Sequence, residues 1–408
     1  MTPEDLDFLL SDAGRDLLAL AAGLDWSRAR LVASTAVVRR ADPGHAAAAI
    51  DVVTARRRAD GRVRGSDRML LTDEAVQQAT AWPVAALRAG RLAGRDVHDV
   101  TCSVGAELAE LVRTADRVVG SDLDRVRARM AAHNVPGALV CVADALAPPS
   151  RDTVLLADPA RRSGGRRIHD PAQLSPPLPD LLAVARDRDH VIKCAPGLDT
   201  SALDHPGEVE LVSLDGSVRE ACLWSPGLSA GVRRRATVVR TTGAGAPPPW
   251  GPPRLVTDGL AVHVEEVTDG DDDEVDAHGE ADRFIVDPDG AVVRAGLVRH
   301  WARRHGLRQL DPRIAHLTGP RIPGGYTGFE VLERCRLDRK ELRQALRRRD
   351  CGSLEILVRG VDTDPDVLRR SLALRGSRPL ALVVTRIDRS AVVFVCGPRT
   401  DQPDGVHS

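Results

Sequence analysis

Four short apolar segments between residues 97 and 158 each end in an aspartate, and this ordered series limits the possible folds more than any other feature. Their β-branched and aliphatic side chains predict strands. The carboxyl ends of parallel strands meet at one edge of an open α/β sheet, and ligands bind at that edge. We therefore predict an α/β fold whose binding edge carries the four terminal acids Asp99, Asp122, Asp144 and Asp158.

A loop of small residues follows the first predicted strand and runs Asp99-Val100-Thr101-Cys102-Ser103-Val104-Gly105. We expect a helix to begin near Gly105, so that its N-terminus and the loop amides face a ligand. Small side chains let such a ligand approach the backbone closely. Asp122 stands about 20 residues beyond the loop, a spacing at which an acid accepts hydrogen bonds from ribose hydroxyls. The pattern indicates a site for a nucleotide-like cofactor.

The loop resembles that of the class I S-adenosylmethionine-dependent methyltransferases, which typically reads Asp-Leu-Gly-Cys-Gly-x-Gly. Thr101 and Ser103 stand where that family usually has two glycines. The resemblance implies S-adenosylmethionine as cofactor, with Asp122 at the ribose hydroxyls and Asp144 at the adenine amino group. The cofactor-binding residues that it implies are Asp99, Thr101, Cys102, Ser103, Gly105, Asp122, Leu123, Asp144 and Ala145.

The fourth predicted strand leads into Asp158-Pro159-Ala160-Arg161, which resembles the Asp/Asn-Pro-Pro-x motif of nucleic-acid methyltransferases. Ala160 replaces the second proline. The resemblance implies that Asp158, Pro159 and Arg161 act on the target base. A carboxylate there accepts a hydrogen bond from an N–H and aligns the nitrogen lone pair with the methyl donor, and such alignment carries most of the catalysis. The structural alternative is an aspartate that only caps the loop.

A second chemical hypothesis concerns Cys194. The stretch Lys193-Cys194-Ala195-Pro196 lies about where uracil-C5 methyltransferases carry a nucleophilic cysteine. A thiolate is required for that chemistry, and a neighbouring ammonium favours it. We favour the alternative of a small buried cysteine at a strand end. The seven cysteines form no CxxC pair, and the histidines show no metal-ligand spacing, so we predict neither a disulfide framework nor a metal site.

The charge of the chain is unevenly distributed. Residues 281–408 carry 24 Lys and Arg against 16 Asp and Glu, a net charge of +8, which leaves −9 on the remainder. A basic region of this kind favours a polyanionic partner such as RNA, whereas the alternative is a set of solvated arginine faces. The residues that we expect to contact phosphates are Arg162, Arg166 and Arg167 beside the predicted active site and Arg339, Lys340, Arg343 and Arg347 on a predicted helix over 338–349.

Three other patterns bear on this C-terminal region. Arg299, Arg303 and Arg304 form a second basic helical face. The acid-rich run 269–282 is either a solvated loop, which we favour, or a segment that neutralises basic residues nearby. Aromatic residues are scarce, and Tyr326 and Phe329 are the candidates in this region for exposed groups that stack on bases.

The predicted organisation has five parts. Residues 375–387 resemble the end of THUMP-like domains, which are RNA-binding modules. This resemblance is the reason for assigning a THUMP-like domain to the C-terminal region. The parts are an N-terminal helical region (1–95), a Rossmann-like seven-strand methyltransferase core (96–228), a linker or extended segment with an acidic loop (229–282), a THUMP-like α+β domain (283–399) and a disordered tail (400–408).

Together these patterns predict a cytoplasmic S-adenosylmethionine-dependent methyltransferase that acts on a base nitrogen in RNA, either tRNA or rRNA. We find neither an N-terminal targeting signal nor an apolar run of about 18 residues that would span a membrane. The replaced glycines and Ala160 motivate an alternative, a non-catalytic RNA-binding protein that retains the fold. A small-molecule methyltransferase is a third possibility. The RNA, the modified position and the oligomeric state stay open.

Overall fold

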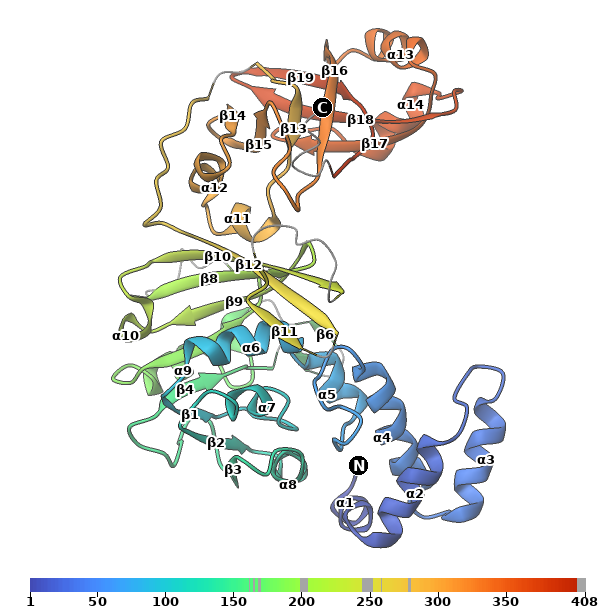
Figure 1. The fold of residues 1–408 in the computed structure, drawn as a ribbon, viewed down its shortest axis with the longest axis vertical. Coiled ribbons are helices and arrows are strands. Elements are labelled where there is room, and N and C mark those ends of the chain that lie inside the picture. The colour runs from blue at the N-terminus through green and yellow to red at the C-terminus, as the bar shows by residue number, and fades with distance from the viewer. Residues whose placement is uncertain are drawn as a thin grey trace. The chain divides into compact units, whose positions relative to one another are not determined.

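The computed structural model describes residues 1–160, 162–163, 166–167, 170–198, 205–243, 252–257, 259–277 and 280–401 (Figure 1). The chain divides into two compact units. The N-terminal unit comprises Met1–Glu208 and Glu220–Gly231, and the C-terminal unit comprises Val209–Arg219 and Val232–Ser408. None of the helices within the described ranges has the length and apolarity that a bilayer-spanning helix needs.

The N-terminal unit begins with a set of helices, as predicted. They are α1 (Pro3–Leu10), α2 (Asp12–Ala22), α3 (Leu31–Ala41), α4 (Ala46–Ala59), α5 (Asp73–Gln78) and α6 (Trp82–Arg91). The Thr72 side chain accepts a hydrogen bond from the Ala75 amide and caps the N-terminus of α5. Leu6, Leu9 and Leu17 are buried in the core that α1, α2 and α4 share, which is why this amphipathic pattern folds as helices.

A mostly parallel sheet follows in the same unit. Its strands are β1 (Asp96–Asp99), β2 (Arg117–Asp122), β3 (Leu139–Val142), β4 (Val154–Ala157), β7 (His190–Cys194) and the end of β9 (Ser217–Trp224). The order is β3-β2-β1-β4-β7-β9, with parallel pairing up to β7 and antiparallel pairing between β7 and β9. The carboxyl ends of β1 to β4 therefore share one edge, as the sequence predicts.

Short elements connect these strands. They are α7 (Leu108–Leu111), α8 (Arg125–Asn134), the hairpin strands β5 (Arg162–Ser163) and β6 (Arg166–Arg167), the 3-10 turn η1 (Pro171–Gln173), α9 (Leu178–Val184) and α10 (Pro226–Ser229). Gly120 on β2 lies so close to the loop after β1 that a Cβ there would stand 2.6 Å from Leu108 and 3.2 Å from the Cys102 sulfur. Glycine at this position lets the loop pack against the sheet.

Three strands lie within the segment 229–282, for which the sequence predicts a linker or extended segment with an acidic loop. The strands of this part of the C-terminal unit are β8 (Glu208–Leu214), β10 (Arg234–Gly243), β11 (Leu255–Thr257) and β12 (Leu260–Thr268). β10 pairs in parallel with β8 and antiparallel with β12. Asp215 and Gly216 form the tight turn after β8, and both have positive φ. Residues 236–242 are rich in Val and Thr, which favour a strand. Their strand propensity decides the structure here, although three arginines precede them and a stretch rich in Pro and Gly follows.

A seven-stranded sheet completes the C-terminal unit. Its strands in spatial order are β14 (Arg308–Asp311), β15 (Ile314–Gly319), β13 (Phe284–Val286), β16 (Gly328–Arg336), β19 (Ser390–Cys396), β18 (Arg378–Ile387) and β17 (Cys351–Arg359). Its helices are α11 (Gly290–Arg294), α12 (Val298–Arg304), α13 (Arg339–Arg348) and α14 (Pro365–Leu372). The predicted α+β character of this region is confirmed, and a short turn at 312–313 separates β14 from β15.

Candidate active site

The loop after β1 is fixed to both neighbouring strands. The Val100 amide donates to the Leu156 carbonyl on β4 at 2.9 Å, and the Cys102 amide donates to the Ser121 carbonyl on β2 at 2.9 Å. Gly105 has φ +87°, and a Cβ there would lie 3.1 Å from Val135 and 3.3 Å from the Ala131 Cα. Only glycine meets both conditions without strain. The helix begins at Leu108 and not near Gly105, because the chain makes a turn over 105–107 first.

Both residues at the usual glycine positions make specific hydrogen bonds. The Thr101 hydroxyl accepts the Asp158 amide at 2.7 Å, and the Thr101 amide donates to Asp99 Oδ1 at 3.0 Å. Thr101 therefore links the end of β1 to the residue after β4. The Ser103 amide donates to Asp122 Oδ2 at 3.0 Å, and Ser103 has φ +48°. The carboxylate thus stabilises a left-handed conformation that a non-glycine residue rarely adopts.

The predicted ribose and adenine residues lie along the same edge but in different environments. Asp122 is half-buried and also accepts the Asp124 amide at 2.9 Å through Oδ1. Leu123 follows it with 74% of its surface exposed. Asp144 is exposed and accepts the Leu146 amide at 2.9 Å in the turn after β3. The other two cofactor candidates, Cys102 and Ala145, are buried. Leu123 and Asp144 are therefore the exposed members of this set, and Asp122 is partly exposed.

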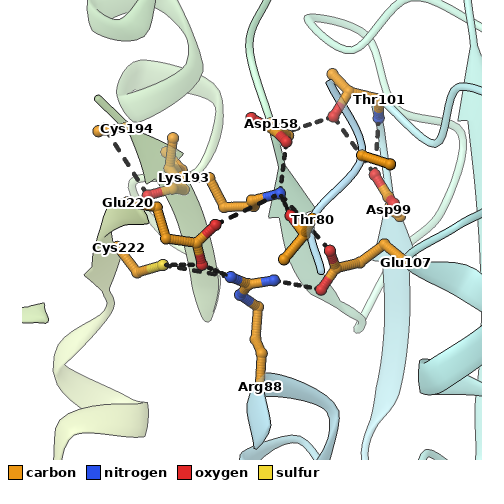
Figure 2. A network of polar contacts seen from close by, with 12 residues as sticks. Thr80, Arg88, Asp99, Thr101, Glu107, Asp158, Lys193, Cys194, Glu220 and Cys222 are labelled. Atoms are coloured by element: carbon orange, nitrogen blue, oxygen red, sulfur yellow. Dashed lines mark hydrogen bonds and ion pairs between the residues drawn. The ribbon is translucent and has the colours of Figure 1, made fainter. Parts of the chain in front are cut away.

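A group of charged side chains lies buried beside Asp158 (Figure 2). The Lys193 ammonium is 2.5 Å from Asp158 Oδ2, 3.6 Å from Glu107 Oε2 and 3.9 Å from Glu220 Oε2. It also donates to the Thr80 hydroxyl. The Arg88 guanidinium donates to both glutamates. We call this group the buried ion cluster: Arg88, Glu107, Asp158, Lys193 and Glu220, with Thr80.

The carboxyl groups in and beside the cluster respond differently to burial. Burial raises the pKa of Asp99 to about 7, and the hydrogen bond from the Thr101 amide opposes that rise. Burial would also raise the pKa of Glu107, but Arg88 and Lys193 outweigh it and hold that pKa below its ordinary value. The two cations therefore balance two of the carboxylates, and Asp158 adds negative charge beyond that balance. Such a site attracts a cation.

Most of the cluster was missed by reasoning from the sequence, because its members are spread from residue 80 to residue 220. One signal was present. All but two of the 57 basic residues are arginine, so a lysine in this chain is unusual. Lys193 was noted only as a neighbour of Cys194. Adjacent residues of a strand point to opposite faces, so the ammonium that contacts Asp158 does not activate that thiol. Cys194 is fully buried, as the favoured alternative predicted.

The residues expected to act on the target separate into three groups. Asp158 keeps 32% of its side-chain surface exposed, whereas Pro159 is buried. Arg161 lies outside the described residues. Arg162, Arg166 and Arg167 belong to the β5–β6 hairpin, whose side chains the structure does not describe. Asp158 is therefore the described residue of this group that a substrate can reach.

Exposed basic residues gather on α13 of the C-terminal unit. Arg339, Lys340 and Arg347 are exposed, while Leu342 and Leu346 pack inward, as predicted. Arg343 is also exposed but donates to the Ser371 carbonyl at 2.9 Å. This face is available to a polyanion, because its cations lie on the solvent side of an amphipathic helix.

The second basic face is neutralised within the unit. Arg299, Arg303 and Arg304 on α12 pair with Asp273, Asp272 and Asp271 at 3.4, 2.8 and 3.0 Å. The favoured expectation of a solvated acidic loop is therefore wrong at these three aspartates, and the alternative of neutralisation holds.

The predicted stacking groups also differ from the structure. Tyr326 and Phe329 are buried, so they are not exposed platforms for bases. The Tyr326 hydroxyl donates to Glu265, a carboxylate that also accepts the Trp301 indole N–H at 3.2 Å. Apolar contacts and this internal acceptor draw the ring inward, which the glycine-rich loop before it did not reveal.

Comparisons with known proteins show which families and folds the chain resembles. A family model described as THUMP domain-like matches residues 326–398, and a model of a domain of unknown function matches residues 2–59. An uncharacterised S-adenosylmethionine-dependent methyltransferase of Mycobacterium tuberculosis, found in two strains, is 49% identical over 367 residues, which is 86% of this chain and 96% of that protein. A crystal structure from Porphyromonas gingivalis, described as that of a methyltransferase, shares the fold with a TM-score of 0.67 at 18% identity over 94% of this chain and 98% of that chain.

Proposed function

The chain belongs to the S-adenosylmethionine-dependent methyltransferases, and from this premise we propose that it methylates a nitrogen of a base in RNA. The observation that carries the proposal is the position of Asp158. It follows β4 at the carboxyl edge of the sheet, its amide is bound to Thr101 of the loop after β1, and its carboxylate is partly exposed. A hydrogen-bond acceptor thus stands directly beside the proposed cofactor loop.

The residues present fit the cofactor. Gly105 lets the loop after β1 pack closely against Ala131 and Val135, which fixes the loop, and Asp122 offers a carboxylate at the proposed ribose position. Leu123 offers an exposed apolar surface beside it. The negative charge that Asp158 adds to the buried ion cluster suits a cationic ligand. When bound, S-adenosylmethionine supplies an electrophilic methyl group on a positively charged sulfur.

The role of Asp158 follows from its chemistry. An ionised carboxylate only accepts hydrogen bonds. It therefore selects a substrate nitrogen that carries an N–H, such as an exocyclic amino group, over a ring nitrogen with a lone pair alone. By holding the N–H it directs the nitrogen lone pair toward the methyl donor, and buried surroundings exclude water from the reacting groups.

RNA is proposed as the substrate because of the C-terminal unit. THUMP domains are RNA-binding modules, and the match over 326–398 includes α13 with its exposed Arg339, Lys340 and Arg347. These side chains suit contact with phosphates and would give affinity without sequence preference. A protein that modifies cellular tRNA or rRNA is expected to work in the cytoplasm.

The test is methyl transfer from radiolabelled S-adenosylmethionine into total RNA from cells that lack the gene for this chain. We expect label in RNA with the wild-type protein and at least a 100-fold lower rate with Asp158→Asn, which keeps the shape but removes the charge. Asp152→Asn, a change at an exposed aspartate in the turn before β4, is the matched control. Label in DNA or in small molecules but not in RNA would contradict the proposed substrate.

A further inference from the structure

We propose that Lys193 is a positioning residue for Asp158, fixing the carboxylate as an oriented, ionised acceptor for the substrate N–H. This inference rests on the proposed function, since it gives Lys193 a part in the same reaction. The ammonium lies 2.5 Å from Asp158 Oδ2 and is itself only 3% exposed. One oxygen of the reactive carboxylate is therefore held by a partner that is buried and has little freedom to move.

Burial makes the charge on Lys193 dependent on its partners. An ammonium without compensation is costly to bury, and it tends to lose its proton instead. Here Asp158, Glu107 and Glu220 all lie within 3.9 Å of Nζ. Opposite charges at this range favour the ionised forms of all the partners. The Asp158 carboxylate is therefore paired with a buried ammonium that two further carboxylates surround.

The shape of the ammonium explains why this position is not arginine. Lysine presents three donors around a compact point charge, whereas the guanidinium is a rigid planar fork. The acceptors around Lys193 come from different elements: Asp158 after β4, Thr80 before α6 and Glu107 before α7. A planar fork does not reach three acceptors arranged in this way. The chain uses arginine almost everywhere else, so lysine here points to a geometric requirement.

Arg88 completes the support of the lysine. From α6 its guanidinium donates to Glu107 and to Glu220 on β9, so both glutamates are held on the side away from Asp158. The Lys193 side chain extends from β7 toward these two glutamates. Because α6, β7 and β9 pack in one core, the position of the ammonium, and with it that of Asp158 Oδ2, is set by the fold and not by a flexible side chain.

The low lysine content allows a direct test of the contact. Protein labelled with 13Cε-lysine gives two lysine signals, from Lys193 and Lys340, and Lys340→Arg assigns them. We expect Asp158→Asn to shift the Lys193 signal and to leave the Lys340 signal in place. Asp152→Asn is the control and should move neither. A Lys193 signal that does not respond to Asp158→Asn would overturn the proposal, whether or not the protein methylates RNA.

The positioning role is tested by kinetics. In Lys193→Met we expect kcat to fall about 100-fold while the KM for RNA and the Kd for S-adenosylmethionine change by less than about threefold. The acidic limb of the pH–rate profile should move to higher pH, because the carboxylate loses the cation that favours its charged form. Lys193→Arg should not restore the rate. A kcat within about threefold of wild type in Lys193→Met would overturn the proposal.

Two further variants separate positioning from stability. Arg91→Met breaks a comparable ion pair, in which Arg91 binds Glu208 at 2.7 and 3.1 Å, without touching the cluster. It should lose stability but keep its pH profile.

If Lys193→Met does not fold, Thr80→Val removes one acceptor of the ammonium and keeps every charge. It should lower kcat without changing KM, and an unchanged kcat would count against the proposal.

Discussion

The Ser103 backbone amide donates a hydrogen bond to Asp122 Oδ2 at 3.0 Å, while Ser103 itself adopts a left-handed φ of +48°. The acid at the end of β2 therefore also shapes the loop after β1. The same carboxylate holds the Asp124 amide through Oδ1. Loop conformation and the proposed ribose contact thus depend on one side chain, which makes the loop sensitive to any change at Asp122.

Replacing Ser103 by glycine should be tolerated. A non-glycine residue in the left-handed region destabilises the folded state by roughly 1–2 kcal/mol, and glycine removes this strain. Glycine also loses more backbone entropy on folding, which costs about 0.5–1 kcal/mol. We expect Ser103→Gly to leave the free energy of unfolding unchanged or to raise it by up to about 1 kcal/mol. Denaturant unfolding measures it. Ser217→Gly on β9, where φ is not positive, is the control and should lower the free energy of unfolding. A clear decrease of the free energy of unfolding in Ser103→Gly would instead show that the Ser103 hydroxyl stabilises the loop.

Gly105→Ala should be more damaging than a similar change elsewhere. Gly105 and Gly94 both have positive φ, but a Cβ at Gly94 meets nothing within 4 Å, whereas one at Gly105 would lie 3.3 Å from the Ala131 Cα on α8. We expect each substitution to cost about 1–2 kcal/mol from φ alone and Gly105→Ala to cost at least about 1 kcal/mol more. Thermal and denaturant unfolding compare them. Equal losses would mean that the close approach to α8 is relieved without cost.

The free energy of unfolding should depend on pH through the protonation of Asp99. Burial raises its pKa to about 7 from an ordinary value of 3.8, so the fold favours the protonated form. That contribution is fully present below pH 3.8 and is lost as pH rises through about 7. We expect Asp99→Asn, which still accepts the Thr101 amide, to become more stable relative to wild type as pH increases from 4 to 8. Melting temperatures across that range test this, and a constant difference would refute it.

RNA affinity should depend on α13 and not on α12. Neutralising Arg339, Lys340 and Arg347 together is expected to weaken RNA binding and to reduce the slope of log affinity against log salt by about 2. The paired variant Arg299→Gln with Arg303→Gln is the control, because Asp273 and Asp272 already neutralise these arginines. Fluorescence anisotropy at several salt concentrations measures both. An equal effect of the two variants would contradict the assignment.

The sequence predicted the strands β1 to β4 and their shared carboxyl edge well, because each of these segments has a dense apolar run followed by an acid. It predicted α13 and its buried Leu342 and Leu346 for a similar reason, a clear helical period. It did not predict β10, because a short β-branched run was read together with the arginines before it and the Pro/Gly stretch after it. The composition around this run did not indicate a strand, because β10 is stabilised by pairing with β8 and β12.

The site was less predictable than the fold. The loop and the strand-end acids could be located, since their chemistry is contiguous in the chain. The role of Thr101 could not, because its hydroxyl serves a residue 57 positions away. The buried ion cluster likewise depends on Thr80, Lys193 and Glu220 meeting in space, and no spacing in one sequence reveals that. Only the rarity of lysine marked Lys193 beforehand.

The central claim is that the loop after β1 and Asp122 bind S-adenosylmethionine. Calorimetric titration of the purified protein with this cofactor tests it most directly, with Asp122→Ala and Asp124→Ala measured in parallel. Asp124 caps α8 through the amides of Val126 and Arg127, so its loss should lower stability by about 1 kcal/mol and leave cofactor binding intact.

We expect micromolar binding by wild type and Asp124→Ala, and loss of binding in a folded Asp122→Ala variant. Absence of binding by folded wild-type protein that carries no co-purified cofactor would contradict the central claim, as would undiminished binding by Asp122→Ala.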